Sequence, residues 1–113
     1  MKVFIFFIFL GFSQFAISDK ISLALNWKAE PQFGGFLAAK VNGHFKAQGL
    51  EVEIQEGGAG TPTVQMLGAG TVQFAIVSAD EIVMARDRGA NLVALFAAFQ
   101  TNPQGIMVHS ERG

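Results

Sequence analysis

The chain has 113 residues, half of them hydrophobic, and a formal net charge of −1, which is the composition of one globular domain at most. It contains no cysteine, so disulfide bonds and thiolate metal sites are both excluded within it. The near-neutral charge leaves no basic footprint for nucleic acid or for an anionic membrane surface.

Residues 1–18, MKVFIFFIFLGFSQFAIS, have the organisation of a secretory signal peptide. Lys2 precedes an unbroken apolar block, Val3–Leu10, and the small residues Ala16 and Ser18 stand at the third and first places before a signal-peptidase cut. The block is shorter than the roughly 20 residues that a membrane-spanning helix needs. We therefore expect cleavage, export to the periplasm and a soluble mature protein.

Residues 19–113 alternate short apolar strands with helices. The segments predicted as strands are Ile21–Leu25, Leu50–Ile54, Val72–Val77, Asn91–Phe99 and the beginning of another at Gly105–Val108. Between them, the first helix is predicted to open after Gly34-Gly35 and to weaken at Asn42-Gly43. Further helices are predicted from Pro62 to Gly68 or Gly70 and from Ser78 to about Arg88. This alternation predicts a parallel sheet with helices on both faces. Because the last predicted strand is barely begun, we expect the chain to be a fragment of a longer protein.

The first predicted helix carries an apolar stripe of Phe33, Leu37, Val41 and Phe45, spaced four residues apart. The third opens with Ser78-Ala79-Asp80-Glu81, which fits a capping box.

The letters GAGT occur twice, at residues 58–61 and 68–71. A dinucleotide site is one interpretation, because Gly58-x-Gly60 follows a strand and Asp80 lies about 20 positions further on. Val64 occupies the place of the third glycine of that fingerprint, however, and its side chain would hold the helix away from the strand. A Walker-type phosphate loop is excluded because no Gly-Lys-Ser/Thr follows.

A structural interpretation explains more of this stretch. Thr61 is a suitable N-cap, Pro62 suits the first helical position, and Gly68 or Gly70 suits the left-handed residue that ends a helix. The N–H groups of the first turn would then be free beside Gly58, where they could donate to a polar or anionic ligand.

Polar and aromatic residues follow the predicted strands on the side where their carboxyl ends meet. Trp27, the only tryptophan, comes just after the first strand, where it could stack on a flat ring or belong to the core. Ser78 and Asp80 follow the third strand, where helix capping alone would justify both. Gln100 follows the fourth. The two histidines, His44 and His109, are isolated and have no ligand spacing, so neither a metal site nor a hydrolase triad is predicted.

The residues as a whole resemble the amino-terminal lobe of the periplasmic substrate-binding proteins of ABC transporters. The stretches that carry the resemblance are LALNWKAEPQFGGFLAAKVNGHFKAQGLEVEI, GGAGTPTVQMLGAGTVQFAIVSADEIVMAR and VALFAAFQTNPQGIMV. The branch that the sequence resembles most is the one related to thiamine-pyrimidine-precursor binding, with nitrate, sulfonate and taurine binders as wider relatives.

The resemblance implies an α/β lobe of the type II periplasmic-binding-protein kind, incomplete because the second lobe is missing, so that residues 19–113 would be the first lobe of a two-lobed protein. Such a protein closes on a small polar heterocycle, such as a thiamine pyrimidine precursor, and delivers it to an ABC permease in the inner membrane. The ligand-binding residues that follow from the resemblance and from the strand ends are Asn26, Trp27, Gln32, Phe33, Gly58, Ala59, Gly60, Thr61, Ser78, Asp80 and Gln100.

We expect from this resemblance a monomer that is not an enzyme and uses no cofactor, metal or nucleic acid. Pyrimidine synthases of the same superfamily use a cysteine-rich motif, and the lack of cysteine argues against that activity here. Two alternatives are an exported enzyme on the same scaffold, either a pyrimidine synthase or a hydrolase, and a truncated gene product without a function of its own.

Overall fold

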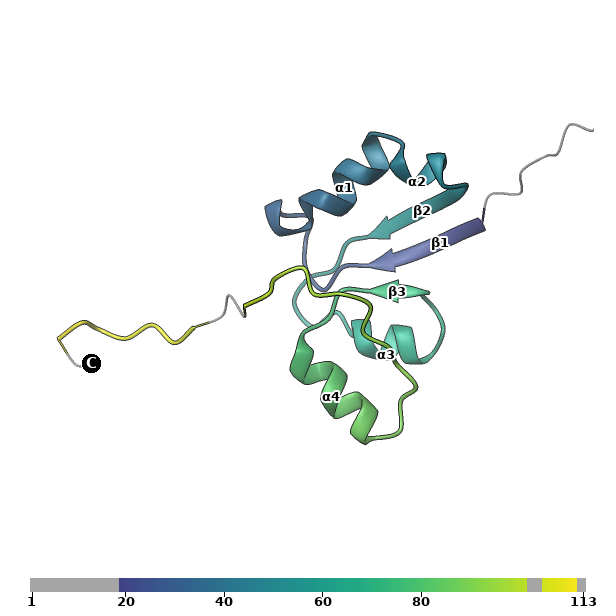
Figure 1. Cartoon of the computed structure of the whole chain (residues 1–113). Helices are drawn as coiled ribbons and strands as arrows, with labels where there is room; N and C mark the ends of the chain where they lie inside the picture. The colour runs from purple at the N-terminus through teal and green to yellow at the C-terminus, as the bar shows by residue number, and fades with distance from the viewer. Residues whose placement is uncertain (1–18, 102–104, 112–113) are drawn as a thin grey trace, which may run out of the picture.

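The computed structural model describes residues 19–101 and 105–111; the signal peptide expected over residues 1–18 lies outside them. Its elements in chain order are β1 Asp19–Ala24, a 3-10 turn η1 Pro31–Phe33, α1 Gly34–Val41, α2 His44–Ala47, β2 Leu50–Gln55, α3 Thr63–Gly68, β3 Phe74–Ala75 and α4 Ala79–Asp87 (Figure 1). No helix in this part of the chain is long and apolar enough to cross a membrane.

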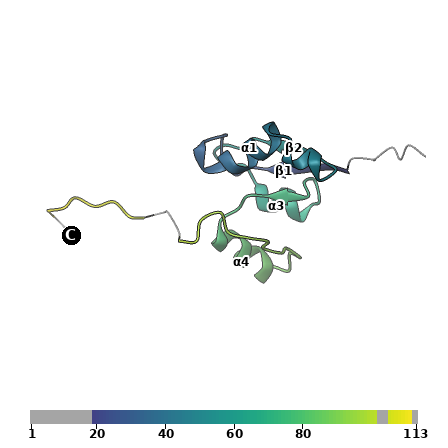
Figure 2. The same cartoon turned by 45° about the horizontal axis from the view of Figure 1, so that its top comes forward.

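The three strands form one parallel sheet in the order β2-β1-β3, and their arrows point the same way in Figure 1. β1 pairs with β2 along its whole length, from Asp19 opposite Leu50 to Ala24 opposite Gln55. The helices α1 and α3 lie on opposite sides of the strands, and α3 lies between the sheet and α4 (Figure 2). The predicted α/β architecture, a parallel sheet with helices on both faces, is confirmed.

The core forms where the middle strand meets the turn that follows it. Leu23, Leu25 and Phe33 are the buried residues of one apolar cluster, and Leu25 is fully buried. Phe36, Val52, Ile54 and Ile76 pack around them. Because β1 is flanked by a strand on each side, its apolar residues are covered by both neighbours and by the helical layers.

The helix ends follow from local sequence. α3 ends with Gly70 in the left-handed conformation (φ 71°), and the N–H of Thr71 reaches back to the carbonyl of Met66 at 3.0 Å. Gly89 ends α4 in the same way (φ 88°). The capping box of Ser78 and Glu81 opens α4, as predicted.

Two of the predicted strands are absent from the described residues. Asn91–Phe99 forms no strand, and most of its side chains are exposed even though Leu92 is buried. The reason is that β3, the strand beside which it would pair, is only two residues long, and a parallel strand needs partners and covering layers. Gly105–Val108 is also irregular. In the stripe of the first helix, Val41 is 84% exposed, and Phe36 faces the core where the four-residue spacing did not place it.

We expect Leu25→Ala to lower the free energy of unfolding by about 2–5 kcal/mol, since it empties a fully buried site next to Phe33. Val41→Ala removes a side chain that is 84% exposed and should change stability by less than about 0.5 kcal/mol. Urea unfolding followed by circular dichroism measures both values. Equal effects of the two substitutions would contradict the assignment of the core.

Candidate ligand-binding site

The carboxyl ends of the strands meet at one edge of the sheet, where the loops after β1, β2 and β3 gather (Figure 1). The chain leaves β1 toward β2 and later crosses back past β1 to β3. Because crossovers between parallel strands are right-handed, these two connections run over opposite faces of the sheet. The loops after β1 and β3 therefore separate at a topological switch point, the place where open parallel α/β domains bind ligands.

The loops after β1 and β2 are in close contact at Gly57. Its N–H donates to the carbonyl of Trp27 at 3.0 Å, which continues the pairing of the strands beyond Ala24. A Cβ on Gly57 would overlap the carbonyl oxygen of Leu25 and lie 3.0 Å from the carbonyl carbon of Asn26. Only glycine allows the two backbones to come this close. Gly57 is absent from the predicted site residues, although a glycine pair directly after a strand is a signal for such a close approach.

The side chain of Trp27 is also held by a hydrogen bond. Its indole N–H donates to Oε1 of Glu30 at 3.2 Å, and the amide of Gln32 donates to Oε2 of the same carboxylate at 2.9 Å. The N–H of Ala29 in this loop donates to Oε2 of Glu56 at 3.3 Å. Trp27 remains 40% exposed, so part of its ring is open to a ligand.

The loop at residues 58–61 uses part of its hydrogen-bonding capacity internally. The N–H of Gly58 donates to the Thr61 hydroxyl at 2.7 Å, and the N–H of Thr61 donates to the carbonyl of Gly58 at 3.1 Å. α3 begins at Thr63 with Pro62 as its N-cap, so the predicted cap role of Thr61 is wrong. Within the described residues, the N–H groups of Ala59 and Gly60 have no intramolecular acceptor, so these two donors can bond to a ligand.

Ser78 and Asp80 lie at the start of α4, beyond the end of β3. The N–H and the hydroxyl of Ser78 both donate to Oε2 of Glu81, at 3.1 and 2.9 Å. The Ser78 hydroxyl, followed by the backbone N–H of Asp80 itself, lowers the pKa of Asp80 below its ordinary value. Asp80 is exposed and therefore presents a carboxylate at neutral pH.

The other predicted site residues are spread more widely. Asn26 is half-buried next to Trp27, and Gln32 is occupied with Glu30. Phe33 is 5% exposed and belongs to the core. Gln100 lies on an irregular segment rather than at the end of a strand, and its amide donates to the carbonyl of Ala97 at 3.3 Å.

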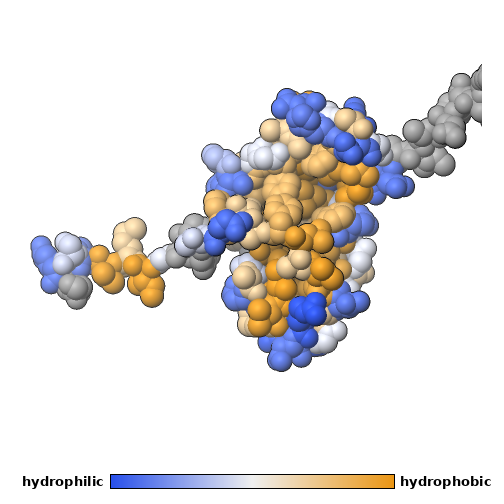
Figure 3. Space-filling model, viewed as in Figure 1, coloured by the Kyte–Doolittle hydropathy of each residue, from blue (hydrophilic) through white to orange (hydrophobic). Residues whose placement is uncertain are grey.

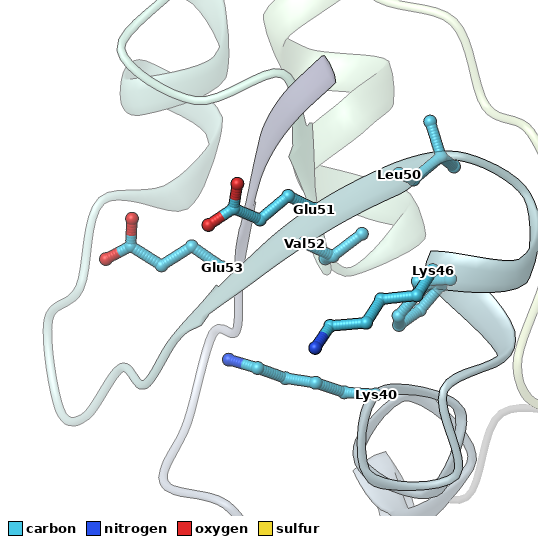
Figure 4. Close-up of a pocket in the computed structure, with 7 residues that line it drawn as sticks. Lys40, Lys46, Leu50, Glu51, Val52 and Glu53 are labelled. Atoms are coloured by element: carbon cyan, nitrogen blue, oxygen red, sulfur yellow. The ribbon is translucent and has the colours of Figure 1, made fainter. Parts of the chain in front are cut away.

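A separate hollow of about 340 Å³ lies beside the amino-terminal half of β2, away from the strand ends. Lys40 and Lys46 reach into it from α1 and α2, over the side chain of Val52 (Figure 4). None of the predicted site residues lines this hollow. Over residues 19–101 and 105–111, no three His, Asp or Glu side chains gather in a way that could hold a metal ion.

These features define an open parallel α/β domain with its candidate ligand crevice at the strand ends. The chain belongs to the NMT1/THI5-like family, whose model matches residues 30–113. This confirms the predicted relation to the thiamine-pyrimidine-precursor group.

Three curated relatives illustrate the family, each named 4-amino-5-hydroxymethyl-2-methylpyrimidine phosphate synthase. The protein from Saccharomyces cerevisiae is 31% identical over 90 residues, which are 80% of this chain and 26% of the relative. The protein from Legionella pneumophila is 21% identical over 98 residues, 87% of this chain and 31% of the relative. The protein from Candida albicans is 28% identical over 72 residues, 64% of this chain and 21% of the relative. The chain thus spans about a quarter of the length of these relatives.

The prediction that the protein is not an enzyme is contradicted by this finding, because these relatives are named as synthases. The prediction rested on the absence of cysteine and on the resemblance to transporter components. Since about three quarters of each relative has no counterpart in this chain, the lack of cysteine in 113 residues does not argue against a synthase.

We expect Gly57→Ala to lower the free energy of unfolding by about 1–3 kcal/mol, because the added methyl group forces the loops after β1 and β2 apart. Trp27 emission should shift at the same time, since the Trp27 carbonyl is bonded to Gly57. Gly58→Ala is the matched control, because a Cβ there meets nothing within 4 Å. Chemical unfolding monitored by fluorescence tests both, and an equal loss for the two variants would refute the close approach.

We expect Ser78→Ala to raise the pKa of Asp80 toward its ordinary value, because the hydroxyl that stabilises the carboxylate is lost. In the unmodified chain the depressed pKa means that Asp80 adds stability above its unfolded pKa and loses that contribution as the pH falls through its folded pKa. The variant should therefore lose less stability on the acid side. Carboxyl-carbon NMR titration gives the pKa directly. Ser110→Ala removes an exposed hydroxyl elsewhere and should leave the pKa of Asp80 unchanged.

Proposed function

We propose that this chain forms the first lobe of an enzyme that produces an aminopyrimidine phosphate, like the relatives named as synthases. The observation that carries the proposal is the placement of Trp27. It follows the central strand at the switch point and keeps 40% of its surface exposed. Its carbonyl accepts a hydrogen bond from Gly57, and its indole N–H donates one to Glu30. A fixed, partly exposed indole at this position suits stacking on a flat heterocycle. The names of the relatives supply the class of heterocycle.

The polar groups on the loops after β2 and β3 suit the same kind of ligand. The N–H groups of Ala59 and Gly60 can donate to a ring nitrogen or a phosphate oxygen. Asp80, whose pKa is lowered, can accept from an exocyclic amino group. In this proposal Trp27 binds the ring, and the loops after β2 and β3 bind its polar edge.

The complete reaction would need groups from a second lobe. The chain matches about a quarter of the relatives, so the rest of the ligand shell and the reacting groups would come from the part without a counterpart here. The names of the relatives support the synthase better than the transport role expected at first. Export to the periplasm is a separate proposal that rests on residues 1–18 alone.

A chimera tests the proposal. Residues 19–113 replace the matching quarter of the Saccharomyces cerevisiae synthase, in a yeast strain that lacks its own copies of this enzyme and needs the pyrimidine for growth. We expect growth without added pyrimidine from the chimera and at least a tenfold loss of product formation from its Trp27→Ala variant. The control is the chimera with Val41→Ala, which alters an exposed residue outside the proposed site. A strain that carries it should grow normally.

A folded chimera that binds the aminopyrimidine phosphate but does not support growth would contradict the enzymatic proposal and favour a binding protein. Circular dichroism establishes the folding of the chimera, and isothermal titration measures its affinity for the aminopyrimidine phosphate.

A further inference from the structure

The carboxylate of Glu30 has an unusual position for an exposed acidic residue. Both of its oxygens accept hydrogen bonds, Oε1 from the indole of Trp27 at 3.2 Å and Oε2 from the amide of Gln32 at 2.9 Å. Exposed glutamates are ordinarily solvated and gain little from a single fixed partner. Here one carboxylate fixes two side chains of the same loop relative to each other.

The backbone of Glu30 is anchored to the core. Its carbonyl accepts the N–H of Phe33 at 2.9 Å, and Phe33 is 5% exposed within the apolar cluster. Pro31 follows Glu30, which restricts Glu30 to the extended conformation that it adopts (φ −119°, ψ 169°). The direction in which the Glu30 side chain leaves the backbone is therefore set by Pro31 and Phe33 rather than by solvent.

We propose that Glu30 is a positioning residue that holds the indole plane of Trp27 ready for a ligand ring. The backbone of Trp27 is fixed by Gly57, but this leaves the side-chain torsions free. The bond from the indole N–H to Glu30 removes that freedom, so the ring is ordered before a ligand arrives. A prearranged ring gives up less conformational entropy on binding. This inference rests on the proposed function only for the identity of the ligand ring.

The contact between Glu30 and Trp27 also determines which part of a ligand can lie against the indole ring. The Glu30 carboxylate lies beside the indole nitrogen, and it would repel a phosphate group placed there. The indole should therefore face the heterocycle, and the phosphate should lie away from Glu30.

Trp27 reports on its own position, because the chain has one tryptophan and no tyrosine. We measure the near-ultraviolet circular dichroism of the full chain and the quenching of its fluorescence by acrylamide. Glu30→Ala should reduce the tryptophan circular dichroism at least twofold and raise the quenching constant about twofold. Gln32→Ala removes the second donor to Glu30 and should change both signals in the same direction by less. Glu53→Ala, an exposed acidic residue on β2, should change neither.

Conservative substitutions separate positioning from a general loss of structure. Glu30→Gln keeps an oxygen that can accept from the indole and should retain most of the circular dichroism signal, whereas the shorter side chain of Glu30→Asp should not reach it. An unchanged tryptophan spectrum in Glu30→Ala, or equal rescue by both conservative substitutions, would overturn the proposal. If Glu30→Ala unfolds, the comparison of Glu30→Gln with Glu30→Asp at matched stability decides the question.

The ligand measurement is kept separate. In the chimera, Glu30→Ala should weaken binding of 4-amino-5-hydroxymethyl-2-methylpyrimidine phosphate about tenfold, and of the dephosphorylated pyrimidine by a similar factor, because the ring contact is what it disturbs. An affinity loss confined to the phosphorylated compound would contradict the positioning role. Failure of the unsubstituted chimera to bind either compound would count against the proposed function, while the tryptophan spectra of the full chain would still decide the role of Glu30.

Discussion

The contact between Gly57 and the backbone of residues 25–27 is the constraint on which the candidate site depends. The pairing of β1 with β2 continues beyond both strands, through the N–H of Leu25 to Gln55 and then the N–H of Gly57 to Trp27. This continuation is possible only because Gly57 has no side chain. Trp27 and the fully buried Leu25 are therefore both held against the chain that leaves β2 by backbone hydrogen bonds. The exposed aromatic ring is an extension of the core rather than part of an independent loop.

The sequence predicted the parts of the fold that local patterns determine. β1, β2, the capping box of α4 and the glycine that ends α3 all follow from alternation, capping and left-handed glycine. The strand predicted at Asn91–Phe99 is absent, because an apolar run becomes a strand only where a partner and a covering layer exist. In the structure, residues 93–99 instead leave an apolar surface, visible over the middle of the molecule in Figure 3, where Phe96 lies 6.1 Å from Phe36 between ring centres.

In the candidate site, too, local patterns predict where the residues lie but not which hydrogen bonds they form. The positions of Trp27 beyond β1 and of Asp80 at the start of α4 follow from the order of the elements, which the sequence predicts. The hydrogen bonds of the site were not predicted. Neither the two bonds that the Glu30 carboxylate accepts nor the bond from Gly58 to Thr61 leaves a periodic pattern in the sequence. The absence of cysteine weighed against a synthase, but the chain corresponds to only about a quarter of its relatives, so a cysteine motif elsewhere in such a protein is left untested by it.

We propose above all that Trp27 binds the ring of an aminopyrimidine phosphate at the carboxyl edge of the sheet. The most direct measurement is an NMR experiment on the chimera saturated with 4-amino-5-hydroxymethyl-2-methylpyrimidine phosphate, recording nuclear Overhauser effects from the ligand methyl protons to the protein. We expect contacts from the methyl group to the indole protons of Trp27. Contacts to Lys40, Lys46 and Val52 in the hollow beside β2, with none to Trp27, would contradict it.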